Sequence, residues 1–377
     1  MMKKTAPAIV ACALACFLPA VSATNAIQWG VNIHSGGSDP ERLAGRLAER
    51  NLKCVRMDLW GNDAKYLTKF RSAAAFLNAK GIAIEAVVYS KFSAGQPRHQ
   101  DFNADLAEVE KSVYESTKPQ IEKTMDVMHD YELQNEISLY KNIRTSGATG
   151  QKAADYDTPC GRLQAAVLRG MSKAIDDVRK ASGQPLRIIL GTTDRSFGLL
   201  SYMQQQGVLF DVVGYHIYPW EQHKPLDQDP WFGAGGPLTQ LAQFKRPLRI
   251  NEFNAGEICS GGPSYPTKSN YENQSGKPIT EAGYRSVDRH LKEIIGQTAA
   301  NVEAVLFYEI WDETRKAIPE NRFGLYYDEE MQQPKVTLLI AASLAGGLLS
   351  SAEKDELLKL GLGNDVTNAA SADRKPQ

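Results

Sequence analysis

This sequence lacks an excess of charge of either sign and has no basic run. Its 43 Lys and Arg residues nearly balance its 44 Asp and Glu residues, which gives a net charge of −1 over 377 residues. Nucleic acid and anionic membrane surfaces require a concentrated patch of Lys and Arg, so the sequence argues against both as main partners. A hydrophobic content of 42% predicts a globular protein with a sizeable core.

Cysteine is also scarce, with five residues in the whole chain. Cys12 and Cys16 fall within a leader segment, which leaves three cysteines in the mature protein. An odd number in an exported protein allows at most one internal disulfide and a free thiol. We expect Cys54 to be a core residue of a strand and place Cys160 and Cys259 in loops, where a Cys160–Cys259 bridge is one pairing. None has the spacing of metal ligands.

The first residues show the pattern of an export signal. Two lysines precede an apolar run over residues 8–18, and small residues at 21–23 offer a cleavage site. The run is too short to span a bilayer, so we expect no integral membrane span. Cleavage after Ala23, with Ala26 as the alternative, predicts a periplasmic or secreted protein. Cys16 in the triplet Leu-Ala-Cys leaves a lipoprotein as the less favoured alternative.

Between the leader and the C-terminal tail, short β-rich runs alternate with longer helical patterns. Glycines just past Lys80, Ser182 and Gln206 are expected to end three of the helices. The expected strands are 28–34, 53–60, 82–89, 130–136, 186–192, 211–218, 247–253 and 303–311. The expected helices are 40–51, 64–80, 104–125, 162–182, 199–206, 238–243, 281–298 and 335–349.

Eight strand–helix units with apolar strands predict an α/β protein with one closed (β/α)8 TIM barrel over residues 24–350. A doubly wound open sheet is the alternative fold. It is disfavoured because no glycine-rich phosphate loop follows the first expected strand. The signal peptide would occupy residues 1–23. The tail, 351–377, is amphipathic at first and then polar, and we expect its last dozen residues to be disordered and the protein to be a monomer.

In such a barrel, catalytic groups lie where the strands end and the following loops gather. The polar and aromatic residues at the expected strand ends form a rim that would be costly to bury without a function. They are Asn32, His34, Arg56, Asp58, Tyr89, Asn135, Glu136, Asp194, His216, Tyr218, Glu252 and Trp311.

Two glutamates of this rim suggest the chemistry. Glu136 and Glu252 end the fourth and seventh expected strands, which face each other across a barrel mouth. Cleavage of a glycosidic bond uses such a pair, one group to protonate the leaving oxygen and the other to attack the sugar. The two must lie in different environments, so that one stays protonated near neutral pH. The alternative is a pair of solvated carboxylates.

Taken with their neighbours, these residues resemble the clan A glycoside hydrolases, particularly families 5 and 39, over the barrel from Trp29 to about Gly347. In that clan the acid/base is a Glu that follows an Asn at the end of strand four, as in Asn135-Glu136, and the nucleophile is a Glu at the end of strand seven, as Glu252 is. Each short motif is weak alone. Because the motifs occur in order and each on its own strand, together they are strong evidence for the resemblance.

The resemblance extends to four further strand-end residues. His216 and Tyr218 are similar to the clan's strand-six histidine and tyrosine, Arg56 to its strand-two arginine and Trp311 to its strand-eight tryptophan. Ile137 departs from the pattern where many members have proline, and Tyr89 departs where family 5 often has histidine. These departures affect the substrate expected, and the choice between the two families stays open.

The resemblance implies a role for each residue in a retaining glycosidase that needs no cofactor and no metal. Glu136 would be the general acid/base and Glu252 the nucleophile, with carboxyl groups about 5–5.5 Å apart. Asn135 would bind the sugar 2-hydroxyl. Tyr218 and Arg56 would keep Glu252 ionised and oriented. Of the remaining binding residues, His216 would contact sugar or the acid/base and Trp311 would form the floor of the subsite at the cleaved bond.

Several residues keep a second interpretation. His34 is either a substrate contact or a hydrogen-bonding loop residue, and Glu132 is either a structural partner of Arg56 or a support for the site. Glu309 is more simply explained by a salt bridge than by sugar binding. Aromatic residues of the loops are suited to sugar stacking as a group and to packing individually. They are Trp60, Tyr140, Trp220, Trp231 and Tyr265. Glu257, Asp312 and Glu313 are further acids near the rim.

Two other functions remain as alternatives to a carbohydrate-cleaving enzyme. A metal-dependent barrel hydrolase would need convergent His and Asp ligands, whereas the chain has six histidines and His34 has no histidine at short spacing. A sugar-binding barrel without catalysis would not need to keep Glu136 and Glu252. The sugar, its linkage, and internal or terminal cleavage stay open, with a β-linked bacterial exopolysaccharide as one candidate.

Overall fold

The computed structural model describes residues 27–34, 39–61, 63–218, 224–254, 281–313, 315–316 and 320–362. Several sequence-based expectations fall outside these residues. They concern the leader, the end of the tail, Trp220, Glu257, Cys259 and Tyr265.

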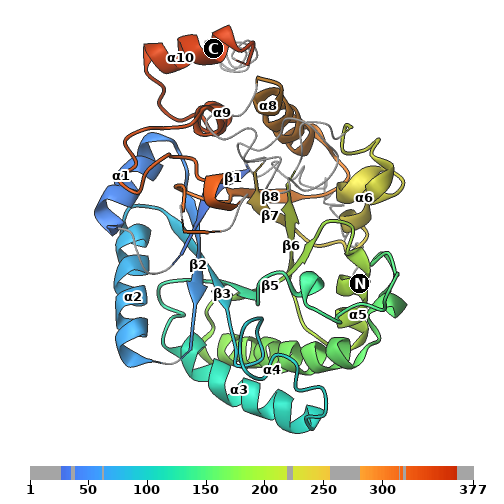
Figure 1. Cartoon of the computed structure of the whole chain (residues 1–377). Coiled ribbons are helices and arrows are strands. Elements are labelled where there is room, and N and C mark those ends of the chain that lie inside the picture. The colour runs from blue at the N-terminus through green and yellow to red at the C-terminus, as the bar shows by residue number, and fades with distance from the viewer. Residues whose placement is uncertain are drawn as a thin grey trace, which may run out of the picture.

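Eight parallel strands form a closed barrel in which each strand pairs with its neighbours in the sequence and β8 pairs with β1. Figure 1 shows the ring of strands with helices around it. The single-domain (β/α)8 TIM barrel predicted from the sequence is therefore confirmed. The strands are β1 Gln28–Ile33, β2 Cys54–Leu59, β3 Ala83–Val88, β4 Asp130–Leu133, β5 Arg187–Thr193, β6 Val212–Ile217, β7 Leu248–Phe253 and β8 Val302–Phe307.

The helices that follow the strands contribute apolar side chains to the core, and they agree with the expected helices apart from their ends, whereas α10 has no expected counterpart. The α-helices are α1 Pro40–Glu49, α2 Ala64–Ala79, α3 Leu106–Glu122, α4 Pro159–Ser182, α5 Phe197–Gln205, α6 Gly236–Ala242, α8 Glu281–Gly296, α9 Val336–Ala345 and α10 Ser351–Lys359. The 3-10 helices are η1 Ile137–Leu139, η2 Ala153–Tyr156, η3 Pro230–Phe232 and η4 Glu320–Arg322.

Helix α4 shows why a helix end was misplaced. Thr158 accepts a hydrogen bond from the backbone N–H of Gly161 at 2.9 Å, and Pro159 occupies the first turn, where its missing N–H costs nothing. The helix thus begins before residue 162, and the expected loop position of Cys160 is wrong, because Cys160 is buried in the first turn. The bridge from Cys160 to Cys259 stays a prediction.

Two strands end three or four residues earlier than the sequence predicted. β4 stops at Leu133, because Gln134 and Glu136 adopt left-handed backbone angles, with φ of 59° and 46°, that a strand does not accommodate. β8 stops at Phe307, four residues before Trp311. The aromatic residue that directly follows β8 is Tyr308. The rim at these two positions is therefore made by short loops, not by strand residues.

The barrel interior carries buried charges among its apolar side chains. Arg56 Nε lies 2.5 Å from Glu132 Oε2 and 3.7 Å from Glu85 Oε1, and Glu85 Oε2 lies 2.7 Å from Arg249 Nε. The ion pairs continue to the N-terminal ends of the strands. There the partners are Asp130, Arg187 and Glu303.

A glycine on β5 makes room for this interior network. A Cβ atom at Gly191 would lie 2.6 Å from Glu132 Oε1, so no side chain fits beside that carboxylate. Buried ion pairs cost desolvation free energy and are weak evidence of stability by themselves. Their fixed geometry instead holds Arg56 in one orientation, which matters because Arg56 reaches the mouth of the barrel.

The tail begins with a short helix, α10, which was not among the expected helices. Ser350 and Glu353 form a capping box at the start of α10, and a bidentate ion pair between Arg50 and Glu353 ties α10 to the end of α1. Figure 1 shows α10 beyond α9 at the edge of the molecule. Among the described residues, no helix combines the length and the apolarity that crossing a bilayer requires.

Candidate active site

Glu136 and Glu252 meet at the C-terminal mouth of the barrel. One carboxylate oxygen of each, together with a ring nitrogen of His216, lies within 4.8 Å of the other two atoms. Retaining glycosidases hold their carboxyl groups about 5–5.5 Å apart, and inverting enzymes hold them about 6.5–9.5 Å apart to admit a water molecule. An approach of two carboxylate oxygens to within 4.8 Å is compatible with the shorter of these two spacings, the one expected from the sequence.

The two glutamates are in different environments. Glu252 lies in β7 with 3% of its surface exposed, next to irregular pairing of β7 with both neighbouring strands, which changes the direction of its side chain. Glu136 is half-buried and lies in the loop after β4, held in the left-handed conformation described above. Such strained backbone persists where the surrounding structure determines it, and it is frequent in active sites.

His216 lies between the two carboxylates. Its Nδ1 atom is 3.2 Å from Glu136 Oε1 and 3.3 Å from Glu252 Oε2, and its Nε2 atom is 3.8 Å from Glu132 Oε1. Burial lowers the pKa of His216, but the surrounding carboxylates raise it more strongly, to about 10. His216 is therefore a buried cation between the two groups, and its predicted contact with Glu136 is confirmed.

Arg56 connects four polar side chains beneath the mouth. Its guanidinium donates hydrogen bonds of 2.7 Å to Asn32 Oδ1, Asn135 Oδ1 and Glu252 Oε1, besides the contact with Glu132. The expected pairing of Glu132 with Arg56 is confirmed. The planar fork of an arginine fixes several acceptors at once, so Arg56 sets the relative positions of the nucleophile candidate and of Asn135.

Tyr218 donates its hydroxyl hydrogen to Glu252 Oε2, as the sequence predicted. Burial raises the pKa of the Glu252 carboxyl above its ordinary value. The charges of His216 and Arg56 and the hydrogen bond from Tyr218 act in the opposite direction. These neighbours thus lower the pKa of Glu252 as expected, but burial, which the sequence did not show, raises it more strongly.

His34 belongs to a second polar cluster beside this site. Its Nδ1 atom lies 2.9 Å from Asp58 Oδ2, and its Nε2 atom accepts a hydrogen bond from Lys316 Nζ at 3.0 Å. Lys316 also lies 2.9 Å from both carboxylate oxygens of Glu309 and 3.4 Å from Glu313. The expected salt bridge of Glu309 is confirmed, and burial raises the pKa of this carboxyl to about 8.

Trp311 does not occupy a strand end. It lies in the loop after β8, 8% exposed, and its backbone pairs with that of Tyr326. Tyr308 instead follows the strand, packs edge-on against Tyr218 at 6.3 Å between ring centroids and accepts a hydrogen bond from Lys316. The sequence analysis missed both Tyr308 and Lys316. If the sequence analysis had ended this strand at Phe307, it would have identified Tyr308 as the strand-end aromatic residue.

Two groups of described residues have metal-ligand geometry. They are Glu136 with His216 and Glu252, and His34 with Glu309 and Glu313. In the second group the Lys316 ammonium already lies among the three side chains and balances part of their charge. In the first group, the ligand atoms are the same atoms that the glycosidase expected from the sequence would use.

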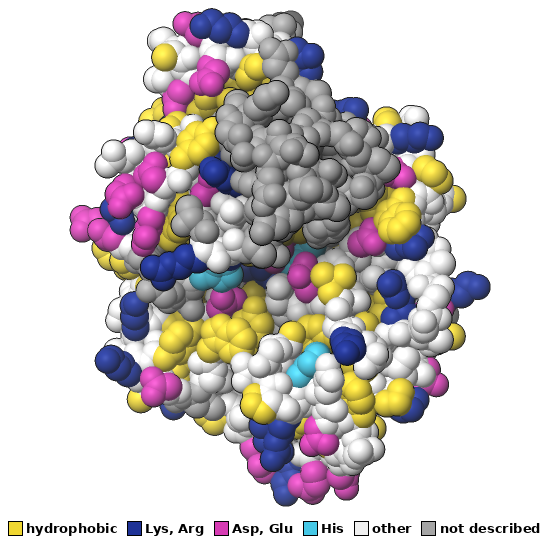
Figure 2. Space-filling view, in the orientation of Figure 1, with side chains coloured by type: hydrophobic (Ala, Val, Ile, Leu, Met, Phe, Trp, Pro, Cys, Tyr) yellow, Lys and Arg dark blue, Asp and Glu magenta, His cyan; other side chains and the backbone are white. Residues whose placement is uncertain are grey.

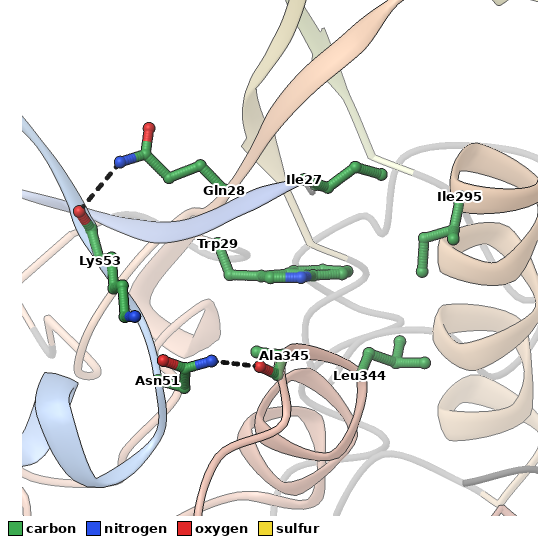
Figure 3. Close-up of a pocket in the computed structure, with 8 residues that line it drawn as sticks. All are labelled: Ile27, Gln28, Trp29, Asn51, Lys53, Ile295, Leu344 and Ala345. Atoms are coloured by element: carbon green, nitrogen blue, oxygen red, sulfur yellow. Dashed lines mark hydrogen bonds between the residues drawn. The ribbon is translucent and has the colours of Figure 1, made fainter. Parts of the chain in front are cut away.

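A cavity of about 460 Å³ lies at the other end of the barrel, between β1 and the ends of α8 and α9. Figure 3 shows Trp29 lying between Ile27 on one side and Asn51 with Ala345 on the other. The ends of Gln28 and Lys53 close its edge. Because catalytic groups of this fold gather at the C-terminal strand ends, this cavity is not part of the candidate active site.

No family model matches the chain, and no curated protein matches it in sequence. Among solved structures, it is similar to a GH53 catalytic domain from Ignisphaera aggregans, with a TM-score of 0.55 and 16% identity over 84% of this chain and 91% of that one. It is also similar to the family 1 β-glucosidase from Thermotoga maritima, alone and in complex with cyclophellitol, with TM-scores of 0.55 and 0.56. In both cases the identity is 12%, over 86% of this chain and 98% of the other. At these identities the similarity establishes the fold, and assignment to family 5 or 39 stays a prediction.

Proposed function

We propose that the protein is a retaining glycoside hydrolase that cleaves β-linked bonds in a poly- or oligosaccharide. The observation that carries the proposal is the approach of Glu136 and Glu252 to within 4.8 Å, with unequal burial, at the catalytic end of a TIM barrel. The fold is also that of a solved β-glucosidase. Neither charge balance nor fold favours another class of partner.

In the first step, a carboxylate oxygen of Glu252 attacks the anomeric carbon while Glu136 donates its proton to the glycosidic oxygen. The bond from the anomeric carbon to that oxygen breaks, and a glycosyl ester of Glu252 forms. In the second step, Glu136 takes a proton from water, the water oxygen attacks the anomeric carbon, and the ester bond breaks. Two inversions give net retention at the anomeric carbon.

The surrounding side chains support this assignment of roles. Arg56, His216 and Tyr218 all contact Glu252, so the nucleophile is held by two cations and one hydroxyl donor. Glu136 is more exposed, with 30% of its side chain accessible to solvent. The group with fixed cations acts as the nucleophile, and the more accessible group acts as acid and base.

Asn135, His34 and Trp311 are proposed to bind substrate. Arg56 holds Oδ1 of Asn135, so its amide N–H groups are the ones oriented to donate to a sugar hydroxyl. Such a contact with the 2-hydroxyl strengthens in the transition state. His34 lies at the edge of the mouth and is 45% exposed. Trp311 is the most buried of the three, and Tyr308 shares its proposed role in the floor of the site.

The test uses a 2,4-dinitrophenyl 2-deoxy-2-fluoro-β-glycoside, which forms a slowly hydrolysed glycosyl-enzyme. We expect stoichiometric labelling of the protein, with the mass increase on the peptide that contains Glu252. The Glu252→Gln variant serves as the control and should remain unlabelled. Labelling on another residue, or inversion of configuration in NMR spectra of fresh product, would refute the mechanism.

The same experiment separates the two alternatives. A carbohydrate-binding barrel without catalysis would bind polysaccharide but would neither label nor turn over an aryl β-glycoside. A metal-dependent hydrolase would lose activity on chelation and would not form the ester. A screen of β-linked polysaccharides, with products separated by length, then identifies the sugar and its linkage.

We further propose that the mature protein is an exported monomer that begins after Ala23. The support is the basic and apolar pattern of the first residues, which is typical of a cleaved signal peptide. Expression of the whole chain, followed by cell fractionation and intact-mass measurement, tests the location and the cleavage site. Light scattering tests the oligomeric state.

A further inference from the structure

Two exposed tryptophans lie above the strands at the mouth of the barrel. Trp60 directly follows β2 and has 37% of its surface exposed, and Trp231 lies in η3, between β6 and α6, with 46% exposed. Single exposed apolar residues are common and need no explanation. These two differ because a neighbouring side chain covers one face of each ring and fixes its orientation.

Tyr89 lies flat against the Trp60 ring. The ring centroids are 3.7 Å apart and the planes differ by 3°. The Tyr89 hydroxyl donates to Asp58 Oδ1 at 3.1 Å, and the other oxygen of Asp58 binds His34. One face of Trp60 is therefore covered by a fixed ring, while 37% of the residue's surface stays exposed.

Arg195 covers the Trp231 ring in the same way, with its guanidinium carbon 3.6 Å from the ring centroid. The indole N–H donates to Asp194 Oδ1, and the Asp194 carbonyl accepts a hydrogen bond from Tyr215 at 2.7 Å. The second ring is thus also held at its edge and on one face. A flat ring presented in one fixed orientation loses little entropy when a ligand stacks on it.

The two rings lie on opposite sides of the catalytic pair. In a closed barrel of eight strands, β2 and β6 are separated by three strands in either direction, so they face each other across the axis. Trp60 follows β2, and Trp231 lies in the connection after β6 and contacts Asp194, which follows β5. A chain of sugars that passes from one ring to the other crosses the mouth where Glu136 and Glu252 meet.

We propose that Trp60 and Trp231 are stacking platforms of two sugar-binding subsites on either side of the cleaved bond, and that the protein cleaves polysaccharide chains internally. This inference rests on the proposed glycosidase function and specifies its substrate. An enzyme that removes terminal sugars needs a binding surface for the chain on one side only. Platforms on both sides bind a chain that continues in both directions.

The same surroundings indicate the kind of sugar. Pyranose rings expose apolar C–H faces, which suit the free face of an indole ring. The carboxylates next to each platform have hydrogen-bond partners, because Asp58 contacts His34 and Asp194 accepts from the indole N–H of Trp231. Figure 2 likewise shows acidic, basic and apolar side chains interspersed over this view, without a large patch of one sign. The platforms therefore suit neutral pyranose chains.

The first experiment follows products over time on soluble β-1,4-galactan, β-1,4-mannan, β-1,4-xylan, β-1,3-glucan and carboxymethyl cellulose. On the polymer that is cleaved, we expect viscosity to fall steeply while few reducing ends appear, and the earliest products to be oligosaccharides of mixed length. Release of a single mono- or disaccharide from the start, with viscosity maintained, would overturn internal cleavage.

The second experiment compares variants on that polymer and on an aryl β-glycoside with one sugar. We expect Trp60→Ala and Trp231→Ala each to lower kcat/KM on the polymer about 10-fold, mainly through KM, with a smaller loss on the aryl glycoside. Trp60→Phe and Trp231→Phe keep a planar face and should recover part of the loss. Leu348→Ala, at an exposed residue that follows α9, is the control and should leave both activities unchanged. Equal losses on both substrates would contradict the platform role.

Binding measured without turnover keeps the two proposals distinguishable. In native gels that contain the same polymers, we expect the Glu252→Gln protein to be retarded by at least one of them and the added Trp60→Ala or Trp231→Ala change to reduce that retardation. Retardation that depends on both tryptophans, without any cleavage by the wild-type protein, would support the platforms and refute the hydrolase. Absence of retardation in every gel, or retardation unaffected by the tryptophans, would overturn the platforms.

Discussion

Nδ1 of His216 lies 3.3 Å from Oε2 of Glu252, and this histidine is buried with a pKa raised to about 10 by the carboxylates around it. A cation beside the proposed nucleophile lowers the pKa of its carboxyl. The same atom lies 3.2 Å from Glu136, so one imidazolium influences both candidate catalytic carboxyl groups. The pH dependence of the reaction should therefore be sensitive to this residue.

The His216→Gln variant tests that relationship, because glutamine keeps a polar side chain without the charge. Removing a cation that lowers the pKa of Glu252 should raise that pKa. We expect the acidic limb of the kcat/KM profile to move to higher pH by about one unit, and kcat/KM at its optimum to fall about 10- to 100-fold. Initial rates on an aryl β-glycoside over a range of pH measure both. A limb that stays at the wild-type position would contradict the electrostatic role.

The Glu136→Gln variant should separate substrates by their leaving groups. A general acid contributes about 10²- to 10⁴-fold when the leaving oxygen needs a proton, and little when that oxygen is a good leaving group. We expect a loss in that range on natural β-linked oligosaccharides and a far smaller loss on a 2,4-dinitrophenyl β-glycoside. The measurement is kcat/KM on both substrates. Similar losses on the two would count against an acid role for Glu136.

The pairing of Glu132 with Arg56 should appear in the pH dependence of stability. The Arg56 cation helps hold the pKa of Glu132 at about 2, below its ordinary value of 4.5, although burial acts in the opposite direction. A carboxyl group whose pKa is depressed on folding stabilises the fold above its unfolded pKa, and the contribution is lost as pH falls through 4.5 toward 2. Denaturant unfolding of the wild type should thus show a loss of stability in this window.

Glu132→Gln removes that titration and leaves Arg56 without its closest carboxylate. We expect the variant to be less stable than the wild type by about 3–5 kcal/mol at neutral pH, because a buried cation loses its partner. The difference should narrow as pH falls from 4.5 toward 2. Glu353→Gln, in the partly exposed pair with Arg50, is the control and should cost about 1 kcal/mol or less. A constant difference across this pH range would show that Glu132 does not titrate as proposed.

Chelation should leave the enzyme active. In the cluster of His34, Glu309 and Glu313, the Lys316 ammonium already supplies a cation, and the proposed chemistry at Glu136 and Glu252 uses protons and an ester. We expect kcat/KM after dialysis against EDTA to stay within about 2-fold of the untreated value, because no step requires a metal ion. A large loss that added Zn²⁺ or Mn²⁺ restores would favour the metal-dependent alternative.

The sequence predicted the barrel well because each βα unit leaves a local signal. Apolar strand runs, helical periodicity and glycines such as Gly183, whose φ is 70°, are all properties of neighbouring residues. The ends of β4 and β8 were misplaced for the opposite reason. The left-handed backbone at Glu136 is imposed by the packing of the mouth, and no local pattern marks it.

The approach of Glu136 and Glu252 was predictable because strand order in this fold brings the ends of β4 and β7 to one opening. The supporting contacts were less so. The contact of Arg56 with Glu132 was anticipated because Glu132 was expected to point into the barrel, but Glu85 and Arg249 lie in the middle and at the start of strands where the sequence indicated an apolar interior. Their pairing joins residues 164 positions apart, which spacing along the chain does not reveal.

The space left by Gly191 also limits how this protein can vary. Adding one methyl group there would bring a carbon atom to 2.6 Å from Glu132 Oε1, and the displaced carboxylate would turn the guanidinium of Arg56 that grips Glu252. A substitution of Gly191 in the barrel wall would therefore displace the proposed nucleophile through two neighbouring side chains, without touching it directly.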